Sequence, residues 1–353
     1  MAEKDYIHNL CAALSEYEQL GIAQQIDYQK FYLYSIITHS TAIEGSTVTE
    51  IENQLLFDEG IAAKGRTMVE QLMNLDLKAA YEQVIKMAPQ HIPFSVDMLK
   101  GLSALVMKNT GSKYSTLMGD FDSSKGDLRK VNVSAGIGGR SYLNYQKVPS
   151  RLESFCESMN ERYAEAVTSN DIIEQYALSF DAHNLLVAIH PWVDGNGRMS
   201  RLIMNYVQFE FGLVPSKVLK EDRAEYIQSL VDSRDQDSLE PFREFMFRSH
   251  LRNITKEIEA YKQSMQADID FTTPKNTDVV KDVVKDVVKE ILQILSQNPT
   301  ATAASIATNL NMSSRQIQRQ MAKLQQQGRL VRHGGRKAGY WEVVSNDDIK
   351  QQP

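Results

Sequence analysis

One short stretch of the sequence, His190–Arg201, contains most of the residue types that could do chemistry. Apolar residues recur at helical spacing over Ile172–Ile189, and Pro191 ends that helix. The turn Gly195-Asn196-Gly197 follows, and a second helix is expected to begin near Arg198. Glycine-rich backbone at a helix N-terminus can direct several N–H groups at one anion, so this stretch predicts a diphosphate-binding nest.

The charged side chains of the same stretch supply the remaining parts of a transfer site. Arg198 and Arg201 lie three residues apart on the second helix, so both can reach one face with groups that match phosphate oxygens. Asp194 offers a hard oxygen ligand beside the nest, where Mg²⁺ would bridge two phosphates. His190 has the pKa that suits proton abstraction near neutral pH. These residues together predict phosphoryl or nucleotidyl transfer.

This stretch resembles the signature of the Fic (filamentation induced by cAMP) family, HPFx(D/E)GNGRxxR. It differs at one fixed position, where Trp192 replaces phenylalanine, and another aromatic should anchor the loop equally well. The resemblance implies a protein adenylyltransferase that moves AMP from ATP to a Ser, Thr or Tyr hydroxyl and releases pyrophosphate. In that reading His190 deprotonates the target hydroxyl and Asp194 holds Mg²⁺.

The same resemblance implies a set of nucleotide contacts. Asn196 and the amides of Gly195 and Gly197 would bind phosphate oxygens, and the two arginines would clamp the outer phosphates. The catalytic residues implied are His190, Asp194, Asn196, Arg198 and Arg201. The ATP-binding residues implied are Gly195, Asn196, Gly197, Arg198, Met199, Ser200, Arg201, Glu44, Tyr226 and Arg234.

A second family mark lies far upstream, in the segment STAIEG from Ser40 to Gly45. It resembles the inhibitory motif (S/T)xxxE(G/N) of Fic proteins, on a helix expected over residues 28–45. The resemblance implies that Glu44 pairs with Arg201 in place of the γ-phosphate, so ATP binds out of line for transfer. Ser40, Glu44 and Gly45 form this inhibitory set. Without the signature loop, a surface glutamate before a helix-ending glycine would explain the pattern.

Two further segments resemble parts of the family's site. Val131, Asn132, Val133 and Ser134 fall in a short hairpin expected over Val131–Ile137, and they resemble the flap that holds the target by strand addition. An ordinary surface hairpin is the alternative. The segment from Arg223 and the helix that follows it to Phe245 resemble the adenine-side helix, with Tyr226 at the base. Arg234 stands where relatives often have asparagine.

The chain as a whole is expected to be all-α, a Fic helical bundle with a small β-hairpin flap and a C-terminal winged helix-turn-helix domain. We expect N-terminal helices over 1–105, a Fic core over 106–262, a linker and charged helix start over 263–287, and the winged helix over 288–353. Helical periodicity is clearest over Tyr28–Ile43, Met68–Met87, Leu152–Ala166, Ile172–Ile189 and Leu202–Phe211. The polar segment Asp268–Asp278 reads as linker, before the repeat VVKDVVKDVVKE at Val279–Glu290.

The C-terminal segment predicts a winged helix from its pattern of helices and strands. A helix ends near Leu295, a second covers Thr302–Leu310, and a third, capped by Ser313, ends at Gly328. Strands are expected at Arg329–Arg332 and Tyr340–Val344. Ser296–Trp341 contains seven basic residues and no acidic one, namely Arg315, Arg319, Lys323, Arg329, Arg332, Arg336 and Lys337. DNA binding through this domain is one reading, and protein docking is the other.

Composition and motif details leave some alternatives open. The two cysteines give no disulfide framework, and no apolar run resembles a signal peptide or a membrane span, so a cytoplasmic protein without membrane partners is expected. A phosphorylating Fic branch carries lysine at the position of Gly197, and a phosphocholine branch departs at that of Asp194, so both residues favour AMP transfer. Removal of AMP by the same loop stays open, as does a homodimer, which is common in the family.

Overall fold

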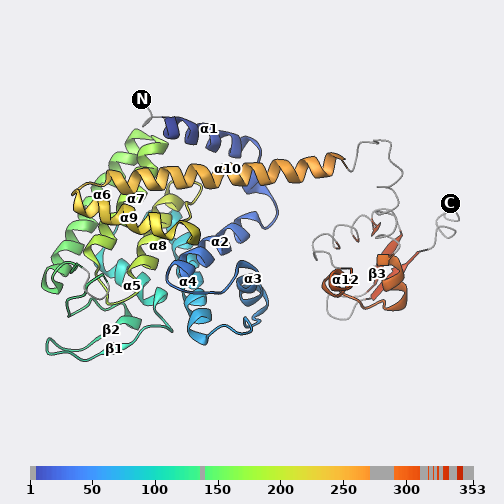
Figure 1. The fold of residues 1–353 in the computed structure, drawn as a ribbon, viewed down its shortest axis with the longest axis horizontal. Helices are drawn as coiled ribbons and strands as arrows, with labels where there is room; N and C mark the ends of the chain where they lie inside the picture. Colours follow the sequence, from blue (N-terminus) through green and yellow to red (C-terminus); the bar gives the residue numbers. More distant parts are fainter. Residues whose placement is uncertain are drawn as a thin grey trace. The chain divides into compact units, whose positions relative to one another are not determined.

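The computed structural model describes residues 5–135, 140–270, 290–310, 317, 321, 324–325, 329–333 and 340–344. It divides into two compact units, Met1–Met265 and Gln266–Pro353, which are described one after the other. The described part is mostly helical (Figure 1), which confirms the all-α prediction. No described helix is long and apolar enough to span a membrane.

The first unit is a bundle of α-helices joined by short turns. The α-helices are α1 (Asp5–Gln19), α2 (Tyr28–Ile43), α3 (Glu50–Glu59), α4 (Met68–Met87), α5 (Val96–Val106), α6 (Val148–Ser169), α7 (Ile172–Ile189), α8 (Asn196–Glu210), α9 (Arg223–Asp235) and α10 (Glu240–Asp270). The short 3₁₀ helices are η2 (Ile22–Gln24), η3 (Ala88–Gln90), η4 (Ser123–Lys125), η5 (Tyr145–Lys147) and η6 (Lys220–Asp222). The bounds predicted for α2, α4 and α7 are confirmed.

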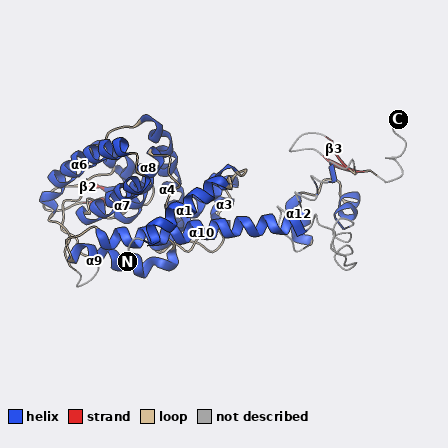
Figure 2. Ribbon diagram, turned by 90° about the horizontal axis from the view of Figure 1, so that it is seen from above, coloured by secondary structure: helices blue, strands red, loops and turns tan. Residues whose placement is uncertain are grey.

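Helix α7 forms the centre of the bundle, where it packs against α6 and α8 (Figure 2). Its buried residues lie on most sides of the helix rather than on one stripe, as expected of a helix enclosed by neighbours. Leu186 and Ala182 pack in one apolar cluster with α8, while Tyr176 and Phe180 pack in a second cluster with α1 and α10. The end of α7, where the signature loop begins, is therefore fixed by packing.

A buried polar network fixes α2, the helix that ends at Glu44. The Thr41 hydroxyl donates to Asn74 Oδ1 of α4 at 2.7 Å, and Asn53 Nδ2 of α3 donates to the same oxygen at 2.8 Å. Asn53 Nδ2 also donates to Thr38 Oγ1 at 2.7 Å. Because buried polar groups of this kind are costly to leave without partners, the network specifies one position for α2 against α3 and α4.

The β structure of the first unit differs from the prediction. Two-residue strands β1 (Lys113–Tyr114) and β2 (Phe121–Asp122) pair antiparallel, and the sequence pattern did not indicate them. The hairpin expected over Val131–Ile137 is a loop with a single bridge between Ser134 and Ser141, and no regular strand forms in its described residues. Ile137 lies outside the described residues.

Two helix boundaries also require correction. Helix α10 continues to Asp270. The linker was expected to begin at residue 263, and its polar segment at Asp268, so both expected starts lie inside the helix. The single helix expected from Arg223 to Phe245 is two helices, because the chain turns between α9 and α10. There Asp237 adopts a positive φ of 48°, and Ser238 Oγ accepts from the first amide of α10, at Glu240.

The second unit has the elements expected of a winged helix. Residues 290–297 are helical, α12 covers Ala303–Asn309, and strands β3 (Leu330–His333) and β4 (Tyr340–Val343) pair antiparallel. Its core contains apolar residues of all three helical segments and of β3, including Ile291, Ile306, Ile317 and Leu330. The bounds predicted for the second helix and both strands agree with the structure within one residue. The repeat over Val279–Glu290 lies outside the described residues except for its last position.

Candidate active site

The signature loop connects the C-terminus of α7 to the N-terminus of α8. His190 ends α7 in the left-handed conformation, with φ 52° and ψ 62°, which non-glycine residues rarely adopt. Gly195, with φ 79°, precedes the first residue of α8, Asn196, two positions earlier than predicted. The first amides of a helix have no partner within the helix, so those of α8 can face an anion, whereas the Gly195 amide donates to Asp194 Oδ1 at 2.6 Å.

The loop is held by Trp192 and Asn196. The Trp192 side chain is fully buried, and its Nε1 donates to the Gly126 carbonyl at 3.1 Å. The Asn196 side chain accepts from the Trp192 amide at 3.0 Å and donates to the Trp192 carbonyl at 2.9 Å. Both ends of the Asn196 side chain thus bond to the loop backbone, which gives Asn196 a role in shaping the nest. One of the two Nδ2 hydrogens is used in these bonds.

His190 is held in its neutral form. The pKa of its imidazole is lowered to about 4, chiefly by burial and also by the positive charge of Arg129, against the opposing effects of the Val187 carbonyl, Glu44 and Asp194. Nδ1 lies 3.4 Å from that carbonyl, which can only accept, so Nδ1 carries the proton and Nε2 is the basic nitrogen. The ring of Tyr142 stacks on the imidazole, with centroids 3.7 Å apart and planes 15° apart.

Arg201 is buried at the centre of the site, and its guanidinium makes four polar contacts. Nε donates to Ser40 Oγ at 2.8 Å, and Nη2 donates to the Ser40 carbonyl at 2.9 Å. Nη1 donates to the Tyr226 hydroxyl at 3.2 Å, and Nη2 also donates to Glu44 Oε1 at 2.6 Å. Two of the three predicted inhibitory residues therefore hold Arg201 directly.

Glu44 lies against the N-terminus of α8. Burial raises the pKa of its carboxyl, but Arg201, Arg198 and Arg223 together bring it below the usual value, so the group is ionised. The carboxylate occupies space that Gly197 leaves free, because a Cβ at residue 197 would stand 2.4 Å from Glu44 Oε1. Gly45, whose φ is 102°, ends the helix beside it.

Arg198 points away from Arg201, which the sequence did not indicate. Its guanidinium lies against the end of α5, with Nη1 3.5 Å from the Val106 carbonyl and Nη2 3.2 Å from Met107 Sδ. Nε has no hydrogen-bond partner, although the side chain is 2% exposed. A buried guanidinium with such weak partners can accept an anion at little cost in broken hydrogen bonds.

Asp194 stands at the open side of the loop with 65% of its side chain exposed. Its Oδ1 accepts from the Gly195 amide at 2.6 Å and lies 3.8 Å from Arg198 Nη2. In the described part of the chain, no three His, Cys, Asp or Glu side chains gather at a metal-binding distance. A single exposed carboxylate fits Mg²⁺, which takes most of its ligands from phosphates and water.

The other residues expected at ATP have different surroundings. Met199 and Ser200 lie on the face of α8 that is buried in the core, so their side chains do not face the loop. Tyr226 is also buried, and its hydroxyl joins His183 Nε2 at 2.8 Å as well as Arg201, which corrects the expected contact with the base. Arg234 is exposed at the end of α9, beside Asp235, which pairs with Arg140 of the flap.

Sequence reasoning missed several residues that support the site. Arg129 donates to the His190 carbonyl, Tyr142 covers the imidazole, and Arg223 Nε donates to the Ile43 carbonyl at 2.9 Å, which fixes the end of α2. His183, which bonds to Tyr226, is buried in the core. The contacts of Arg129, Tyr142 and Arg223 join positions 48 to 180 residues apart in the sequence, so no local pattern indicates them.

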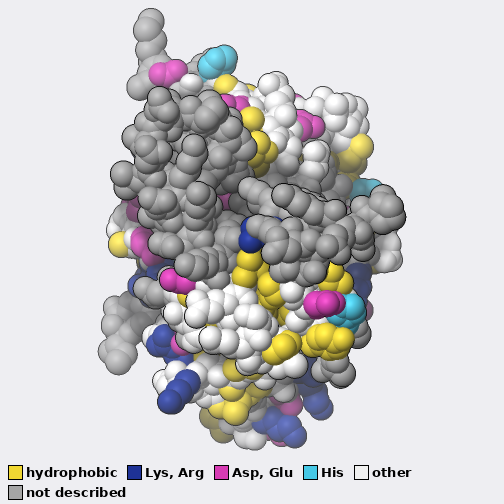
Figure 3. Space-filling model, turned by 90° about the vertical axis from the view of Figure 1, so that its right-hand side faces the viewer, with side chains coloured by type: hydrophobic (Ala, Val, Ile, Leu, Met, Phe, Trp, Pro, Cys, Tyr) yellow, Lys and Arg dark blue, Asp and Glu magenta, His cyan; other side chains and the backbone are white. Residues whose placement is uncertain are grey.

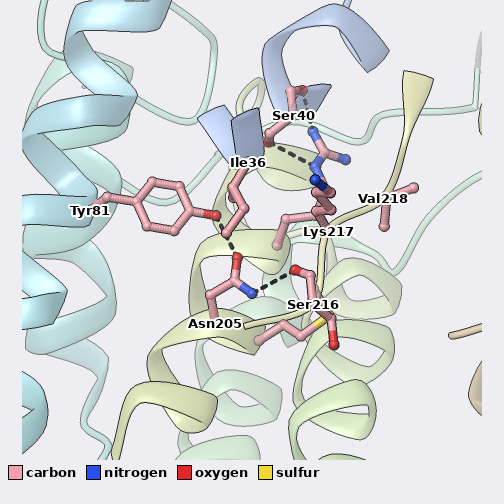
Figure 4. A pocket seen from close by; sticks show the side chains of 9 residues that line it. Ile36, Ser40, Tyr81, Asn205, Ser216, Lys217 and Val218 are labelled. Atoms are coloured by element: carbon pink, nitrogen blue, oxygen red, sulfur yellow. Dashed lines mark hydrogen bonds between the residues drawn. The ribbon is translucent and has the colours of Figure 1, made fainter. Parts of the chain in front are cut away.

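A small pocket lies behind Ser40 and Arg201, between α2, α4 and α8 (Figure 4). Tyr81 donates to Asn205 Oδ1 at 2.6 Å, and Asn205 Nδ2 donates to the Ser216 carbonyl at 2.8 Å. Figure 4 shows the two bonds that Ser40 accepts at the top of this pocket. The residues that line this pocket therefore help to hold Arg201 in place.

Comparison with known proteins identifies the two units. Residues 93–208 match the family model of the Fic/DOC family, and residues 286–331 match that of the winged helix-turn-helix DNA-binding family. Residues 93–208 are therefore similar to a Fic domain. Protein adenylyltransferase fic-1 of Caenorhabditis elegans is 24% identical over 260 residues, which are 73% of this chain and 47% of that protein. Protein adenylyltransferase Fic of Drosophila willistoni is 26% identical over 238 residues, which are 67% and 43%.

This chain spans about half the length of the curated relatives it matches. Solved structures show the same fold. A Fic domain containing signaling protein of Bacteroides thetaiotaomicron has a TM-score of 0.58 at 19% identity, covering 72% of this chain and 97% of its own. A Fic family protein of Desulfovibrio desulfuricans has a TM-score of 0.56 at 16% identity and covers 97% of both chains.

The neutral state of His190 predicts a pH dependence of stability. Its pKa is lowered from 6.5 to about 4 in the folded Fic domain, so between those values the unfolded chain binds a proton that the folded chain does not. The free energy of unfolding therefore falls as the pH falls through this window, by at most roughly 1.4 kcal/mol per pH unit for this group. His190→Gln removes that contribution.

Urea unfolding of both proteins across this window measures the difference. Two other buried histidines, His183 and His250, also have lowered pKa values, but they contribute equally to both proteins. We expect the wild-type free energy to fall more steeply than that of His190→Gln. Parallel curves would show that His190 titrates at its ordinary value in the folded state.

Proposed function

We propose that the Fic domain transfers AMP from ATP to a Ser, Thr or Tyr hydroxyl of a protein. The observation that carries the proposal is that one loop, braced by Asn196, joins a neutral histidine to an open helix N-terminus. A neutral imidazole can take a proton, and a helix N-terminus binds phosphates. The names of the matched relatives, protein adenylyltransferases, support the same reaction.

The reaction then follows from positions in the loop. The phosphates of ATP bind at the N-terminus of α8, between Arg198 on one side and Arg201 on the other. The target hydroxyl gives its proton to Nε2 of His190 as its oxygen forms a bond to the α-phosphorus. The bond from that phosphorus to the bridging oxygen breaks on the opposite side, and pyrophosphate leaves. The loop contributes mainly by positioning these groups.

Mg²⁺ fits beside Asp194, whose exposed carboxylate is the available protein ligand in the loop. When bound, Mg²⁺ would neutralise charge on the phosphates of ATP. Asp194 itself is oriented by the Gly195 amide, which donates to its Oδ1. The loop therefore offers Mg²⁺ one protein ligand, the Asp194 carboxylate.

Glu44 restrains this reaction in our proposal. Its carboxylate holds Arg201 at 2.6 Å, and Arg201 would otherwise be available to the γ-phosphate. A phosphate that binds elsewhere shifts the α-phosphorus out of line with the hydroxyl, and small displacements reduce transfer strongly. ATP binding and restraint can therefore coexist, as the resemblance of the Ser40–Gly45 segment implied.

The flap is proposed to hold the target backbone. The Tyr142 amide donates to the Val133 carbonyl at 3.0 Å, and the Ala135 amide donates to the Arg140 carbonyl at 3.1 Å. The Asn132 side chain accepts from the Tyr145 amide, so it shapes the flap rather than reaching the target. Tyr142 of this segment stacks on His190, so a target segment that pairs with the flap backbone would bring its hydroxyl to the base.

The transfer is tested with ATP labelled on the α-phosphate in one reaction and on the γ-phosphate in another, with Mg²⁺ and, as target, a cell extract that has been heated to inactivate its own kinases. We expect α-label on protein and none from the γ-phosphate. His190→Ala should reduce labelling by at least about a hundredfold, the usual loss for a general base, and leave ATP affinity within about twofold. Protein labelled from the γ-phosphate would instead make the domain a kinase, and labelling that survives in His190→Ala would remove His190 as the base.

The restraint is tested with Glu44→Gly in the same assay. Release of Arg201 should raise α-labelling about tenfold or more, because the phosphates regain in-line geometry. Glu59→Gly is the matched control, since Glu59 also ends a helix before a glycine and is exposed. An equal effect of both substitutions, or none from Glu44→Gly at saturating ATP, would make Glu44 a helix-end residue without regulatory effect.

The winged helix suggests a second function, binding to DNA, which we propose for residues 286–331 on their family match. Five of the seven basic residues of Ser296–Trp341, namely Arg315, Arg319, Lys323, Arg336 and Lys337, lie outside the described residues. Arg332 is described, and its guanidinium lies 4.7 Å from the centre of the Trp341 ring. Figure 3 draws one face of the molecule, with the described Lys and Arg side chains in dark blue.

A gel-shift titration of the full chain at rising salt tests DNA binding. Phosphate contacts predict affinity that falls steeply as salt increases, by about one power of salt concentration per contact. Arg332→Ala should lower affinity at every sequence and reduce that slope by about one. A chain that fails to shift DNA even at low salt would leave protein docking as the function of this unit.

A further inference from the structure

Arg129 lies between the flap and the loop that carries His190. It is 2% exposed and is among the largest fully buried side chains of the described residues. Its Nε donates to the His190 carbonyl at 2.7 Å, Nη1 donates to the Val131 carbonyl at 2.8 Å, and Nη2 donates to the Leu143 carbonyl. Its backbone amide donates to the Pro191 carbonyl at 3.1 Å.

These bonds join three segments that are separate in the sequence. Val131 begins the flap, Leu143 ends it, and His190 ends α7. Among the described residues, no carboxylate forms an ion pair with Arg129, so only carbonyl dipoles balance its charge. Burial lowers the pKa of the guanidinium accordingly. A buried charge without a counter-ion is expensive, and a neutral side chain would fill the same space at lower cost.

We propose that Arg129 is a positioning residue that joins the flap and His190 into one unit, so that the base and the bound target cannot move independently. The proposal rests on the AMP-transfer function given above. Only an arginine can donate in three directions from one plane, whereas a lysine presents a single point of charge. The three bonds to the His190, Val131 and Leu143 carbonyls therefore require a guanidinium group.

Two features of the loop show why such a connection is needed. His190 adopts a left-handed backbone conformation that is strained for a non-glycine residue, and Arg129 holds its carbonyl in that conformation. Tyr142, next to Leu143, stacks on the imidazole at 3.7 Å. Release of the Leu143 carbonyl would free Tyr142 and the ring that it covers.

The test compares Arg129→Lys, Arg129→Met and Lys130→Met, all in the Glu44→Gly background so that transfer is measurable. Lys130 is the matched control, because it is the adjacent cation and donates to the Asp120 carbonyl instead. We expect Arg129→Lys to lower kcat about tenfold or more and to change the KM for ATP less than about twofold, since positioning affects the transfer step. Lys130→Met should match the parent.

Amide hydrogen exchange gives a readout that is independent of transfer. In Arg129→Lys, exchange should become faster at Tyr142 and Ala135 in the flap and at His190 in the loop, while the other amides of α7 and the amides of α4 keep their protection. Faster exchange throughout the Fic domain, or no difference between Arg129→Lys and Lys130→Met in rate and exchange, would overturn the proposal. If even the parent fails to transfer AMP, coupled exchange of flap and loop still supports the connection while the proposed function fails.

Discussion

The hydrogen bonds and ion pair of one buried cation, Arg201, determine how the active site is arranged. Arg201 donates to Ser40 and Glu44 of the α2 end and to Tyr226 of α9, so a single guanidinium joins three elements. A buried arginine must keep such partners, since an unpaired charge in the interior costs several kcal/mol. Any anion that binds Arg201 from outside therefore competes with Glu44 for a group already satisfied.

This constraint gives the position of α2 a functional meaning. The network of Thr41, Asn53 and Asn74 fixes the helix against α3 and α4, and Arg223 holds the carbonyl of Ile43 at its end. Glu44 thus reaches Arg201 from a rigid support. In the proposed function, restraint and transfer therefore share one residue. Arg198 has weaker partners: its closest carboxylate, that of Asp194, lies 3.8 Å from Nη2, and its Nε has no hydrogen-bond partner.

The sequence predicted the parts of the fold that depend on local pattern. The bounds of α2, α4 and α7 followed from uninterrupted apolar spacing, with Pro191 after α7, and the density of chemical groups identified the loop at His190–Arg201. Strands β1 and β2 were missed because two residues are too few to show alternation. The partners of Asn196, Tyr226 and Arg129 were not predicted, because they are set by tertiary packing. Residue type indicated chemistry in each case, but only the fold shows which polar atoms are already bonded.

The account depends most on exchange of Glu44 for a phosphate at Arg201, and nucleotide affinity measures that exchange directly. Calorimetric titration of ATP and ADP into wild type, Glu44→Ala, Arg201→Gln and the double variant forms a thermodynamic cycle. The account predicts that Glu44→Ala increases the preference for ATP over ADP about tenfold, a coupling typical of linked sites, and that Arg201→Gln abolishes this increase. An equal increase in the Arg201→Gln background, or no increase in either, would contradict it.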